Sequence, residues 1–255
     1  MIEDHHTNAF ILIEELCYKW PNGSAQTKIG PVNFEAHLGE IIGIYGRSGT
    51  GKSTLLRMIV GELKPTSGRM DIPNNYKVLY HDQNQKLVPW LNASQNVMIN
   101  SKKNVSDEYV EKIFELCGLN LFADRSATAL SGGQRARVSI ARTLIENGEV
   151  VLLDEPFSGI DIKSQEMLID EMKRTVSDKI LVLTSHDPGI LVQLCTQIVC
   201  FTDPSSLSVA SNSDEAASTK IFQIDEKMIN LSPKERKSYS LYMSEIQRLS
   251  GFIYE

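Results

Sequence analysis

The chain of 255 residues contains no apolar run of about 18 residues, which is the length that a membrane-spanning helix requires. Its first residues, MIEDHHTNAF, are polar and do not include the apolar centre of a secretion signal. Positive charge is not in excess, because 26 Lys and Arg stand against 32 Asp and Glu and the formal net charge is −6. We therefore expect no membrane span, no secretion signal and no nucleic acid attracted by a basic surface.

Cysteine is also scarce, and none of the four cysteines belongs to a CxxC pair. Three of them lie in apolar runs or helical patterns, which predicts buried free thiols in a reducing cytosol. The cysteines are Cys17, Cys117, Cys195 and Cys200.

What the sequence does contain is an alternation of short apolar runs with helical patterns. This alternation is typical of an α/β fold with a mostly parallel sheet. The apolar runs are nearly continuous, as expected for strands covered on both faces. Buried strands are predicted at residues 41–45, 150–154, 180–184 and 198–201.

The segment from about 86 to 148 has a helical pattern instead. One predicted helix begins after Ser106, which is a suitable cap, and ends at Gly118. Its apolar positions follow helical spacing at Val110, Ile113, Phe114 and Cys117. We expect this segment to form a helical subdomain inserted in the α/β core.

The last part of the chain differs in composition from the rest. Residues 203–219 are rich in Ser, Asp and Asn and predict a flexible loop. Residues 232–235, with the sequence SPKE, predict a capping box at the start of a terminal helix. The apolar face of that helix is formed by Tyr239, Tyr242, Ile246 and Leu249. We therefore predict a main domain at 1–202 and a C-terminal extension at 203–255.

A glycine-rich loop, YGRSGTGKST, stands between the predicted strand 41–45 and an apolar helical pattern. Glycines allow backbone N–H groups to turn toward an anion, and the N-terminus of the following helix favours negative charge at the same place. Lys52 has the reach to contact β- and γ-phosphates, and Ser53 offers a hydroxyl to Mg²⁺. The pattern Gly46-x-x-x-x-Gly51-Lys52-Ser53 therefore predicts a nucleoside triphosphate site.

Two carboxylates end the apolar strand in VVLLDEP, residues 150–156. Asp154 suits a contact with Mg²⁺, directly or through water. Strand alternation is expected to turn Glu155 the opposite way, toward an attacking water that a carboxylate can polarise. This pair favours hydrolysis over phosphoryl transfer to an acceptor.

A second candidate anion site is LSGGQ, residues 130–134, at the start of a helical pattern. One chain therefore carries two half-sites for phosphate, the glycine-rich loop and LSGGQ, although a phosphate loop needs only one. Two chains paired head to tail would complete both sites, so we expect a closed dimer.

These motifs together resemble those of the ATP-binding subunits of ABC transporters. GRSGTGKS is similar to the Walker A loop of that family, LSGGQ to its signature and VVLLDEP to its Walker B strand. Gln83 resembles the Q-loop glutamine, SGID at 158–161 the D-loop, and LTSHD at 183–187 the segment with the switch histidine. The resemblance covers about residues 10–201. It implies a P-loop NTPase core with an N-terminal antiparallel β subdomain and a helical insert subdomain.

The resemblance also implies residue roles in ATP hydrolysis with Mg²⁺. Glu155 would position water, His186 would hold the γ-phosphate, Gln83 would sense it and move the helical insert, and Asp161 would link two sites across a dimer. The implied metal site consists of Ser53, Gln83 and Asp154. The implied nucleotide contacts are Trp20, Gly46, Arg47, Ser48, Gly49, Thr50, Gly51, Lys52, Ser53 and Thr54, with Ser131, Gly132, Gly133 and Gln134 from the partner chain.

Some assignments have an alternative. Tyr18 is a second candidate for the aromatic that stacks on adenine, and Gln85 is a second candidate for Gln83. Trp90 is either a core residue or a contact with a membrane subunit. We expect His81 to be a surface residue.

The subtype is indicated by LVPWLNASQNV and by the terminal segment, which resemble importer ATPases of the nitrate, sulfonate and taurine group. The implied partners are a second copy of the chain or a paired ATPase subunit, membrane permease subunits and, in an import system, a periplasmic or surface substrate-binding protein. The chain itself would be a peripheral subunit at the cytoplasmic side of the cell membrane. The alternatives are an export or lipid-transport system and a non-transport ABC ATPase. A P-loop kinase or GTPase would lack LSGGQ and the histidine segment.

Overall fold

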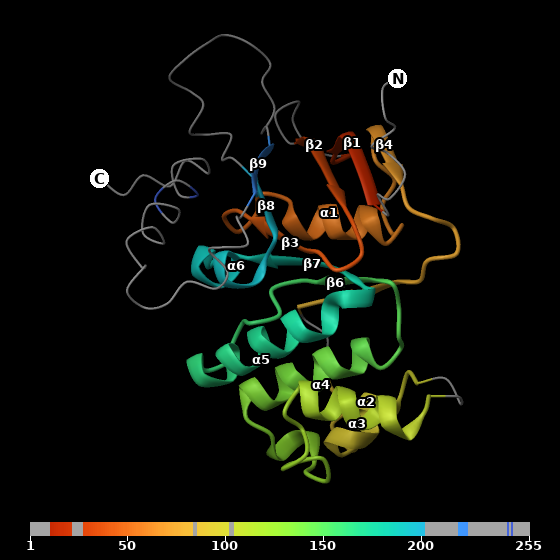
Figure 1. Ribbon diagram of the computed structural model, residues 1–255, viewed down its shortest axis with the longest axis vertical. Coiled ribbons are helices and arrows are strands. Elements are labelled where there is room, and N and C mark those ends of the chain that lie inside the picture. Colours follow the sequence, from red (N-terminus) through yellow and green to blue (C-terminus); the bar gives the residue numbers. More distant parts are fainter. Residues whose placement is uncertain are drawn as a thin grey trace.

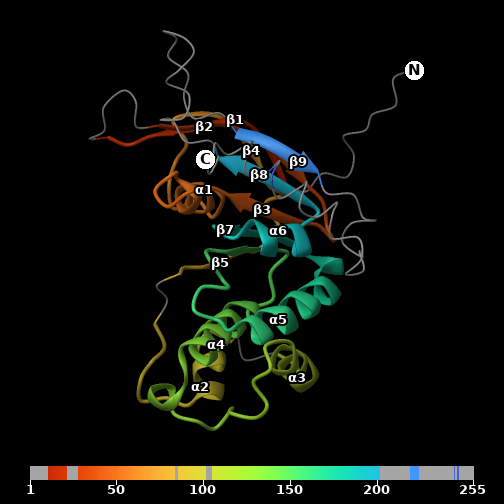
Figure 2. The ribbon, with the colours of Figure 1, turned by 90° about the vertical axis from the view of Figure 1, so that its left-hand side faces the viewer.

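The computed structural model describes residues 11–21, 28–83, 86–101, 105–201 and 219–223, together with Ser244 and Ile246. Two sheets and a group of helices form the molecule. The small antiparallel sheet lies at one end, helices α2, α3 and α4 lie at the other, and the large sheet lies between them (Figures 1 and 2). The predicted class, an α/β fold with a mostly parallel sheet, is confirmed.

The large sheet has the strand order β5-β6-β7-β3-β8-β9, and every pairing except β8 with β9 is parallel. The four strands predicted from apolar runs are present, each within one residue of its expected bounds. The strands are β3 (Ile41–Tyr45), β5 (Val78–His81), β6 (Val150–Leu153), β7 (Ile180–Ser185), β8 (Gln197–Phe201) and β9 (Thr219–Gln223).

The continuous apolar runs are explained by two cores, one on each face of this sheet. On one face, Ile42 and Leu152 pack with helix α1 (Lys52–Ile59) and the small sheet. On the other face, Ile41 and Val151 pack with the remaining helices. Neighbouring residues of a strand point to opposite faces, so both must be apolar when both faces are covered.

The small sheet is antiparallel, in the order β2-β1-β4, as the resemblance implied. Its strands are β1 (Ile11–Lys19), β2 (Lys28–Ala36) and β4 (Ser67–Asp71).

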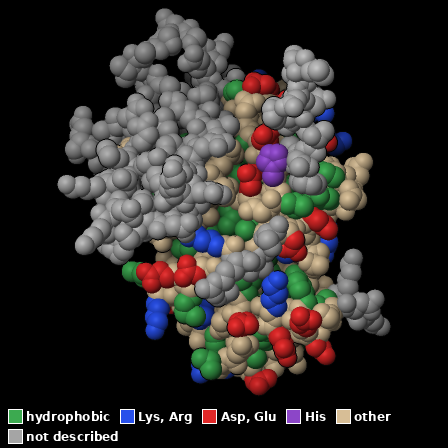
Figure 3. All heavy atoms as spheres, viewed as in Figure 1, with side chains coloured by type: hydrophobic (Ala, Val, Ile, Leu, Met, Phe, Trp, Pro, Cys, Tyr) green, Lys and Arg blue, Asp and Glu red, His purple; other side chains and the backbone are tan. Residues whose placement is uncertain are grey.

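The expected helical insert is present between β5 and β6. Its helices are α2 (Ala93–Met98), α3 (Asp107–Leu116), the 3₁₀ turn η1 (Ala127–Ala129) and α4 (Gly132–Leu144). The Ser106 side chain caps α3 by accepting a hydrogen bond from Tyr109 N, and Gly118 follows the helix with φ of 59°. Charged side chains of both signs are interspersed over this part in Figure 3, so the face shown carries no basic patch.

The helices after the insert cover one face of the large sheet. They are α5 (Ile162–Thr175), η2 (Val176–Asp178) and α6 (Pro188–Leu194). No helix among the described residues is long and apolar enough to cross a membrane. The cysteines are free thiols; Cys117, Cys195 and Cys200 are buried and Cys17 is half-buried. Burial raises the pKa of the Cys117 thiol to about 12, as expected for an inert core residue.

One expectation was wrong, and one of two open alternatives is excluded. His81 was expected at the surface, but it is only 5% exposed, because alternation along β5 turns it toward α4, where Thr143 Oγ1 lies 3.5 Å from its Nδ1. Trp90 is 81% exposed and is not a core residue.

The predicted C-terminal extension is described only in part. Strand β9 was not expected from the sequence; it pairs with β8 from within the proposed extension. Ile246 is helical and fully buried, in agreement with its place on the predicted apolar face. The rest of the expected loop, the capping box at 232–235, Tyr239, Tyr242 and Leu249 lie outside the described residues. The division at residue 202 stays a prediction.

Candidate active site

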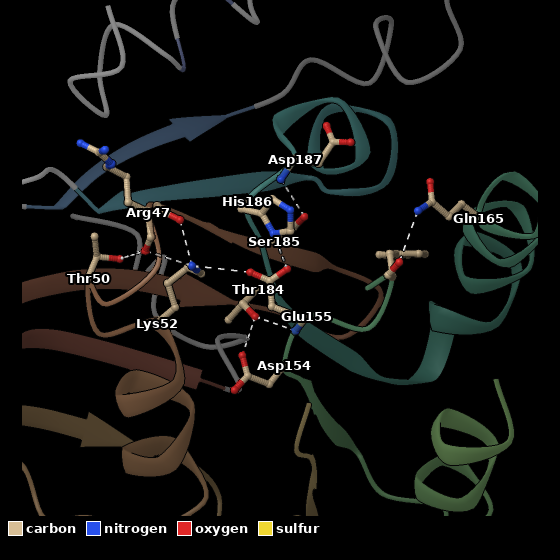
Figure 4. Close-up of polar contacts among 12 residues, drawn as sticks. Arg47, Thr50, Lys52, Asp154, Glu155, Gln165, Thr184, Ser185, His186 and Asp187 are labelled. Atoms are coloured by element: carbon tan, nitrogen blue, oxygen red, sulfur yellow. Dashed lines mark hydrogen bonds and ion pairs between the residues drawn. The ribbon is translucent and has the colours of Figure 1, made fainter. Parts of the chain in front are cut away.

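The glycine-rich loop joins the end of β3 to the start of α1. Gly51, directly before α1, has φ of 101°, and a Cβ added there would lie 2.2 Å from Ile29 Cγ2. Any side chain at this position would therefore be strained by its backbone and would collide with β2. Thr50 Oγ1 donates a hydrogen bond to the Arg47 carbonyl over 2.9 Å, which closes the loop on itself (Figure 4).

Lys52 lies beneath this loop and is only 7% exposed. Its Nζ donates hydrogen bonds to the carbonyl oxygens of Gly46 at 2.8 Å and Arg47 at 3.2 Å. The same ammonium lies 3.6 Å from Glu155 Oε1. A buried ammonium is unfavourable unless it has polar partners, so these three contacts stabilise the Lys52 side chain beside the loop.

Asp154 follows directly after β6 and is 4% exposed. Its Oδ1 accepts a hydrogen bond from Thr184 Oγ1 at 2.7 Å, and its Oδ2 accepts one from Tyr80 OH at 3.3 Å. Burial and the neighbouring Asp154 carboxylate raise the pKa of Tyr80 to about 12. Tyr80 therefore stays protonated at neutral pH and remains a donor to this carboxylate.

Glu155 is positioned by its backbone rather than by strand alternation, and here the expectation was wrong. The strand ends at Leu153, and Glu155 has φ of 49°, an uncommon value for a residue other than glycine. Asp154 and Glu155 consequently line the same pocket. The Glu155 Oε2 atom lies 3.0 Å from Nδ1 of His186, which is exposed at the end of β7 (Figure 4).

These elements surround an open pocket of about 750 Å³. Its lining comes from the glycine-rich loop, from α1, and from the segments that directly follow β1, β5, β6 and β7. Its lining residues are Trp20, Arg47, Ser48, Gly49, Gly51, Lys52, Ser53, Thr54, Gln83, Asp154, Glu155 and His186.

The donors in this pocket fit a triphosphate with a divalent cation. A buried ammonium and the N-terminus of α1 offer positive charge to phosphate. The Ser53 hydroxyl and the buried Asp154 carboxylate are oxygen ligands of the kind that Mg²⁺ prefers. The Glu155 carboxylate lines the same pocket, and a carboxylate there can accept a proton from water.

Trp20 lines the pocket and is 37% exposed, whereas Tyr18, its alternative, is not among the lining residues. The two rings meet edge to face, with centroids 5.6 Å apart. Gln83 is exposed and lines the pocket, while Gln85 lies outside the described residues. Both main candidates therefore line the pocket, and their roles stay predictions.

The LSGGQ segment is not part of this pocket. Ser131 caps α4 in a reciprocal box with Gln134: Ser131 Oγ accepts from Gln134 N at 3.2 Å, and Gln134 Oε1 accepts from Ser131 N at 3.0 Å. Gly132 lines a second pocket of about 600 Å³, together with Gln83 and Glu155. A Cβ on Gly133 would lie 3.4 Å from the Gly159 carbonyl, so the segment adjoins the SGID turn.

Asp161 ends that turn and caps α5, where its Oδ1 accepts a hydrogen bond from Ser164 N at 3.0 Å. Hydrogen bonds from Ser164 hold the pKa of this exposed carboxyl below its usual value. Within one chain, therefore, the signature and Asp161 lie together but apart from the phosphate loop.

The first residues of the helical insert, Lys86 and Val88, are hydrogen-bonded to its helices α4 and α2. Arg142 of α4 donates from both terminal nitrogens to the Lys86 carbonyl, each over 3.2 Å. Asn96 of α2 is fully buried; its Oδ1 accepts from Val88 N at 2.8 Å and its Nδ2 donates to Val88 O at 3.1 Å. These hydrogen bonds connect α4 and α2 to the chain that begins three residues after Gln83.

Two polar residues at the site were not singled out from the sequence, Tyr80 and Thr184. Each stands in a strand, and each contacts Asp154. The available signal was a hydroxyl in a buried strand, since such a group needs a partner.

The geometry agrees with the comparisons to known proteins. Residues 29–158 match the family described as ABC transporter. The chain is 32% identical over 219 residues to the bicarbonate transport ATP-binding protein CmpD of Synechocystis sp., covering 78% of this chain and 77% of that protein. It is 36% identical over 180 residues to the aliphatic sulfonates import ATP-binding protein SsuB 1 of Pseudomonas savastanoi pv. phaseolicola, covering 69% of this chain and 75% of that protein.

A solved structure of the ATP-binding cassette MJ0796, a dimer in a post-hydrolysis state bound to ADP and Pi, is also similar. It has a TM-score of 0.62 and 27% identity, and covers 74% of this chain and 93% of that one. The chain thus belongs to the ABC transporter family as an ATP-binding subunit. It is an ATPase whose hydrolysis of ATP is coupled to transport, and its resemblance to importer ATPases of the nitrate and sulfonate type is confirmed.

Proposed function

We propose that two copies of this chain, or this chain and a paired subunit, close around two ATP molecules and thereby drive membrane permease subunits. The observation that carries the proposal is the convergence of Lys52, Glu155 and His186 on one pocket, with the signature outside it. Each pocket would then be completed by Ser131, Gly132, Gly133 and Gln134 of the partner chain.

In the proposed mechanism, backbone amides of the loop enclose the phosphates, and Lys52 neutralises their charge. These amides belong to Gly46, Arg47, Ser48, Gly49, Thr50, Gly51, Ser53 and Thr54, together with Lys52 itself. Ser53, Gln83 and Asp154 would hold Mg²⁺, which when bound neutralises phosphate charge. Trp20 would stack on the base. The Glu155 carboxylate accepts the proton of the attacking water, and the imidazole of His186 donates a hydrogen bond toward the γ-phosphate.

Asp161 is proposed to act across the dimer. It lies beside its own signature segment, which in a head-to-tail pair would meet the partner's pocket. Gln83 lines both of the pockets described above and lies three residues before Lys86, whose carbonyl accepts hydrogen bonds from Arg142 of α4. We assign it the role of relaying the state of the phosphates to the helical insert.

The head-to-tail arrangement can be tested by removing one cap hydroxyl. In a Glu155→Gln background, which is expected to slow hydrolysis, Ser131→Ala should weaken the ATP-dependent dimer. The measured quantity is the ATP concentration at which light scattering shows half of the change from monomer mass to dimer mass. We expect a shift of about tenfold, from the loss of a hydrogen bond to a charged phosphate.

Ser106→Ala provides the matched control. Both serines cap helices, so each substitution should cost about 1 kcal/mol of helix stability. Only Ser131 belongs to the proposed interface. Equal weakening by both variants, or by neither, would contradict the arrangement.

The transport role is proposed to be import of a small molecule or anion, because the relatives are named for import of aliphatic sulfonates and transport of bicarbonate. The chain would then work at the cytoplasmic face of the membrane, as a peripheral subunit. The exposed Trp90 lies on the helical insert, where a membrane subunit can reach it.

A pull-down of the tagged chain from detergent-solubilised membranes of the source organism, followed by mass spectrometry, tests this role. Import predicts a stoichiometric multi-span protein and a substrate-binding protein. A permease without a binding protein would favour export or lipid transport. Soluble partners alone, with the chain absent from the membrane fraction, would favour a non-transport ABC ATPase.

A further inference from the structure

Thr184 lies between the two acidic residues of the site, although it belongs to the neighbouring strand. It is fully buried near the end of β7. Its Oγ1 donates a hydrogen bond to Asp154 Oδ1 at 2.7 Å and accepts one from Glu155 N at 2.8 Å (Figure 4). One hydroxyl therefore contacts the side chain of the first acidic residue and the backbone of the second.

The sheet register explains this position. Strands β6 and β7 are parallel, and Leu153 is paired with Leu183, so Thr184 stands beside Asp154 one step further along. The residues before it, Ile180 to Leu183, are buried and apolar. A hydroxyl in such surroundings is unfavourable unless both its donor and its acceptor are used, and here both are.

The contact with Thr184 helps to hold Glu155 in its unusual backbone conformation. The left-handed φ of 49° is sparsely populated by residues with a side chain and persists only where surrounding contacts hold it. The hydrogen bond from Glu155 N to Thr184 Oγ1 fixes the peptide that joins the two acidic residues. The direction of the Glu155 side chain toward Lys52 and His186 follows from that peptide.

Asp154 has a second donor, but at a longer distance. Tyr80 OH lies 3.3 Å from Oδ2, compared with 2.7 Å for the Thr184 contact at Oδ1. Loss of the Thr184 hydroxyl would leave this buried carboxylate with the weaker of the two hydrogen bonds and free to rotate about χ2.

We infer that Thr184 is a positioning residue, whose hydroxyl sets the orientation of the Asp154 carboxylate and of the Glu155 backbone for hydrolysis. The inference rests on the proposed roles of Asp154 and Glu155. It adds a fully buried residue that does not itself line the pocket and acts through both acidic residues at once.

Thr184→Val tests the inference in the full chain, because valine keeps the shape and removes only the hydroxyl. Groups that orient a metal-binding carboxylate typically contribute about 10- to 100-fold, so we expect kcat to fall by that factor. The KM for ATP should rise by less than kcat falls, since the phosphate loop is unaltered and only the Mg²⁺-dependent part of binding is weakened. Thr184→Ser, which restores the hydroxyl, should recover most of kcat.

A second measurement does not depend on turnover. Nucleotide affinity is measured by Trp20 fluorescence, once with Mg²⁺ and once with EDTA. The ratio of the two affinities should decrease in Thr184→Val, because a misoriented Asp154 binds the cation less well, while affinity in EDTA should be unchanged. A role in stability alone would lower the melting temperature and leave this ratio as it is.

Thr196→Val is the matched control. The Thr196 hydroxyl also bridges two groups, donating to Ile41 O at 3.1 Å and accepting from Ile41 N at 3.3 Å. It does so at the start of β3, the end of the strand away from the phosphate loop. This variant should keep the wild-type kcat and the wild-type Mg²⁺ ratio.

Wild-type kcat and Mg²⁺ ratio in Thr184→Val would overturn the inference, and so would a Thr184→Ser variant as slow as the valine variant. If valine prevents folding, Thr184→Ala and Thr184→Ser are compared instead, since they differ only in the hydroxyl. Failure of the proposed function is distinct: it would be seen as Mg²⁺-independent hydrolysis by the wild type or full turnover in Glu155→Gln.

Discussion

Glu155→Gln should reduce ATP turnover by at least about a hundredfold, because general-base catalysis typically contributes a factor of 10² to 10⁴ and an amide cannot accept the proton of water. The side chain keeps its size, so the pocket and its contacts with ATP should persist. We therefore expect ATP affinity to change little and an ATP-dependent dimer to accumulate. Steady-state phosphate release and light scattering with ATP measure the two effects.

Glu149→Gln is the appropriate control for this result. Glu149 stands directly before β6, at the opposite end of the strand from Glu155, where its Oε2 accepts a hydrogen bond from Lys77 N at 2.8 Å. It should lose little turnover. Undiminished hydrolysis in Glu155→Gln would remove Glu155 from the mechanism.

Lys52→Ala should weaken ATP binding by about ten- to a hundredfold, since a hydrogen bond to a charged group contributes roughly 1.5–3 kcal/mol. The substitution also leaves the Gly46 and Arg47 carbonyls without their Nζ donor. Turnover should be lost with the affinity. Equilibrium titration with a fluorescent ATP analogue measures the change directly.

Lys179→Ala separates this effect from the loss of any buried lysine. Lys179 is also 7% exposed, and its Nζ donates to Asn147 Oδ1 at 2.7 Å, next to the start of β7 and away from the pocket. The control should unfold at a lower temperature than the wild type and yet bind ATP normally. Unchanged affinity in Lys52→Ala would count against the phosphate-loop assignment.

The parts of this fold that could be predicted from sequence are those fixed by local requirements. Strand β3 matched its expected bounds because a strand covered on both faces must be apolar at every position. The loop was recognised from its local pattern, Gly46-x-x-x-x-Gly51-Lys52-Ser53, and the structure adds that only glycine fits the backbone at Gly51 beside Ile29. The same holds for Ser106, whose capping of α3 was expected from its place directly before a helical pattern.

The parts that could not be predicted depend on contacts distant in sequence. Burial of His81 follows from α4 packing over β5, and nothing near residue 81 indicates that helix. The direction of Glu155 depends on a backbone turn that Thr184, 29 residues later, helps to hold. The assigned roles of the site residues stay predictions until the variants are measured.

Strand β5 occupies one edge of the six-stranded sheet, so among the described residues its backbone ladder has a single neighbour, β6. Gln83 follows this strand by two residues, and Lys86 beyond it is held by α4. Displacing β5 breaks one ladder, whereas displacing β3 breaks two. Amide protons of β5 should accordingly exchange with solvent before those of β3. By this count β5, after which the helical insert begins, is held less firmly in the sheet than β3, which precedes the phosphate loop.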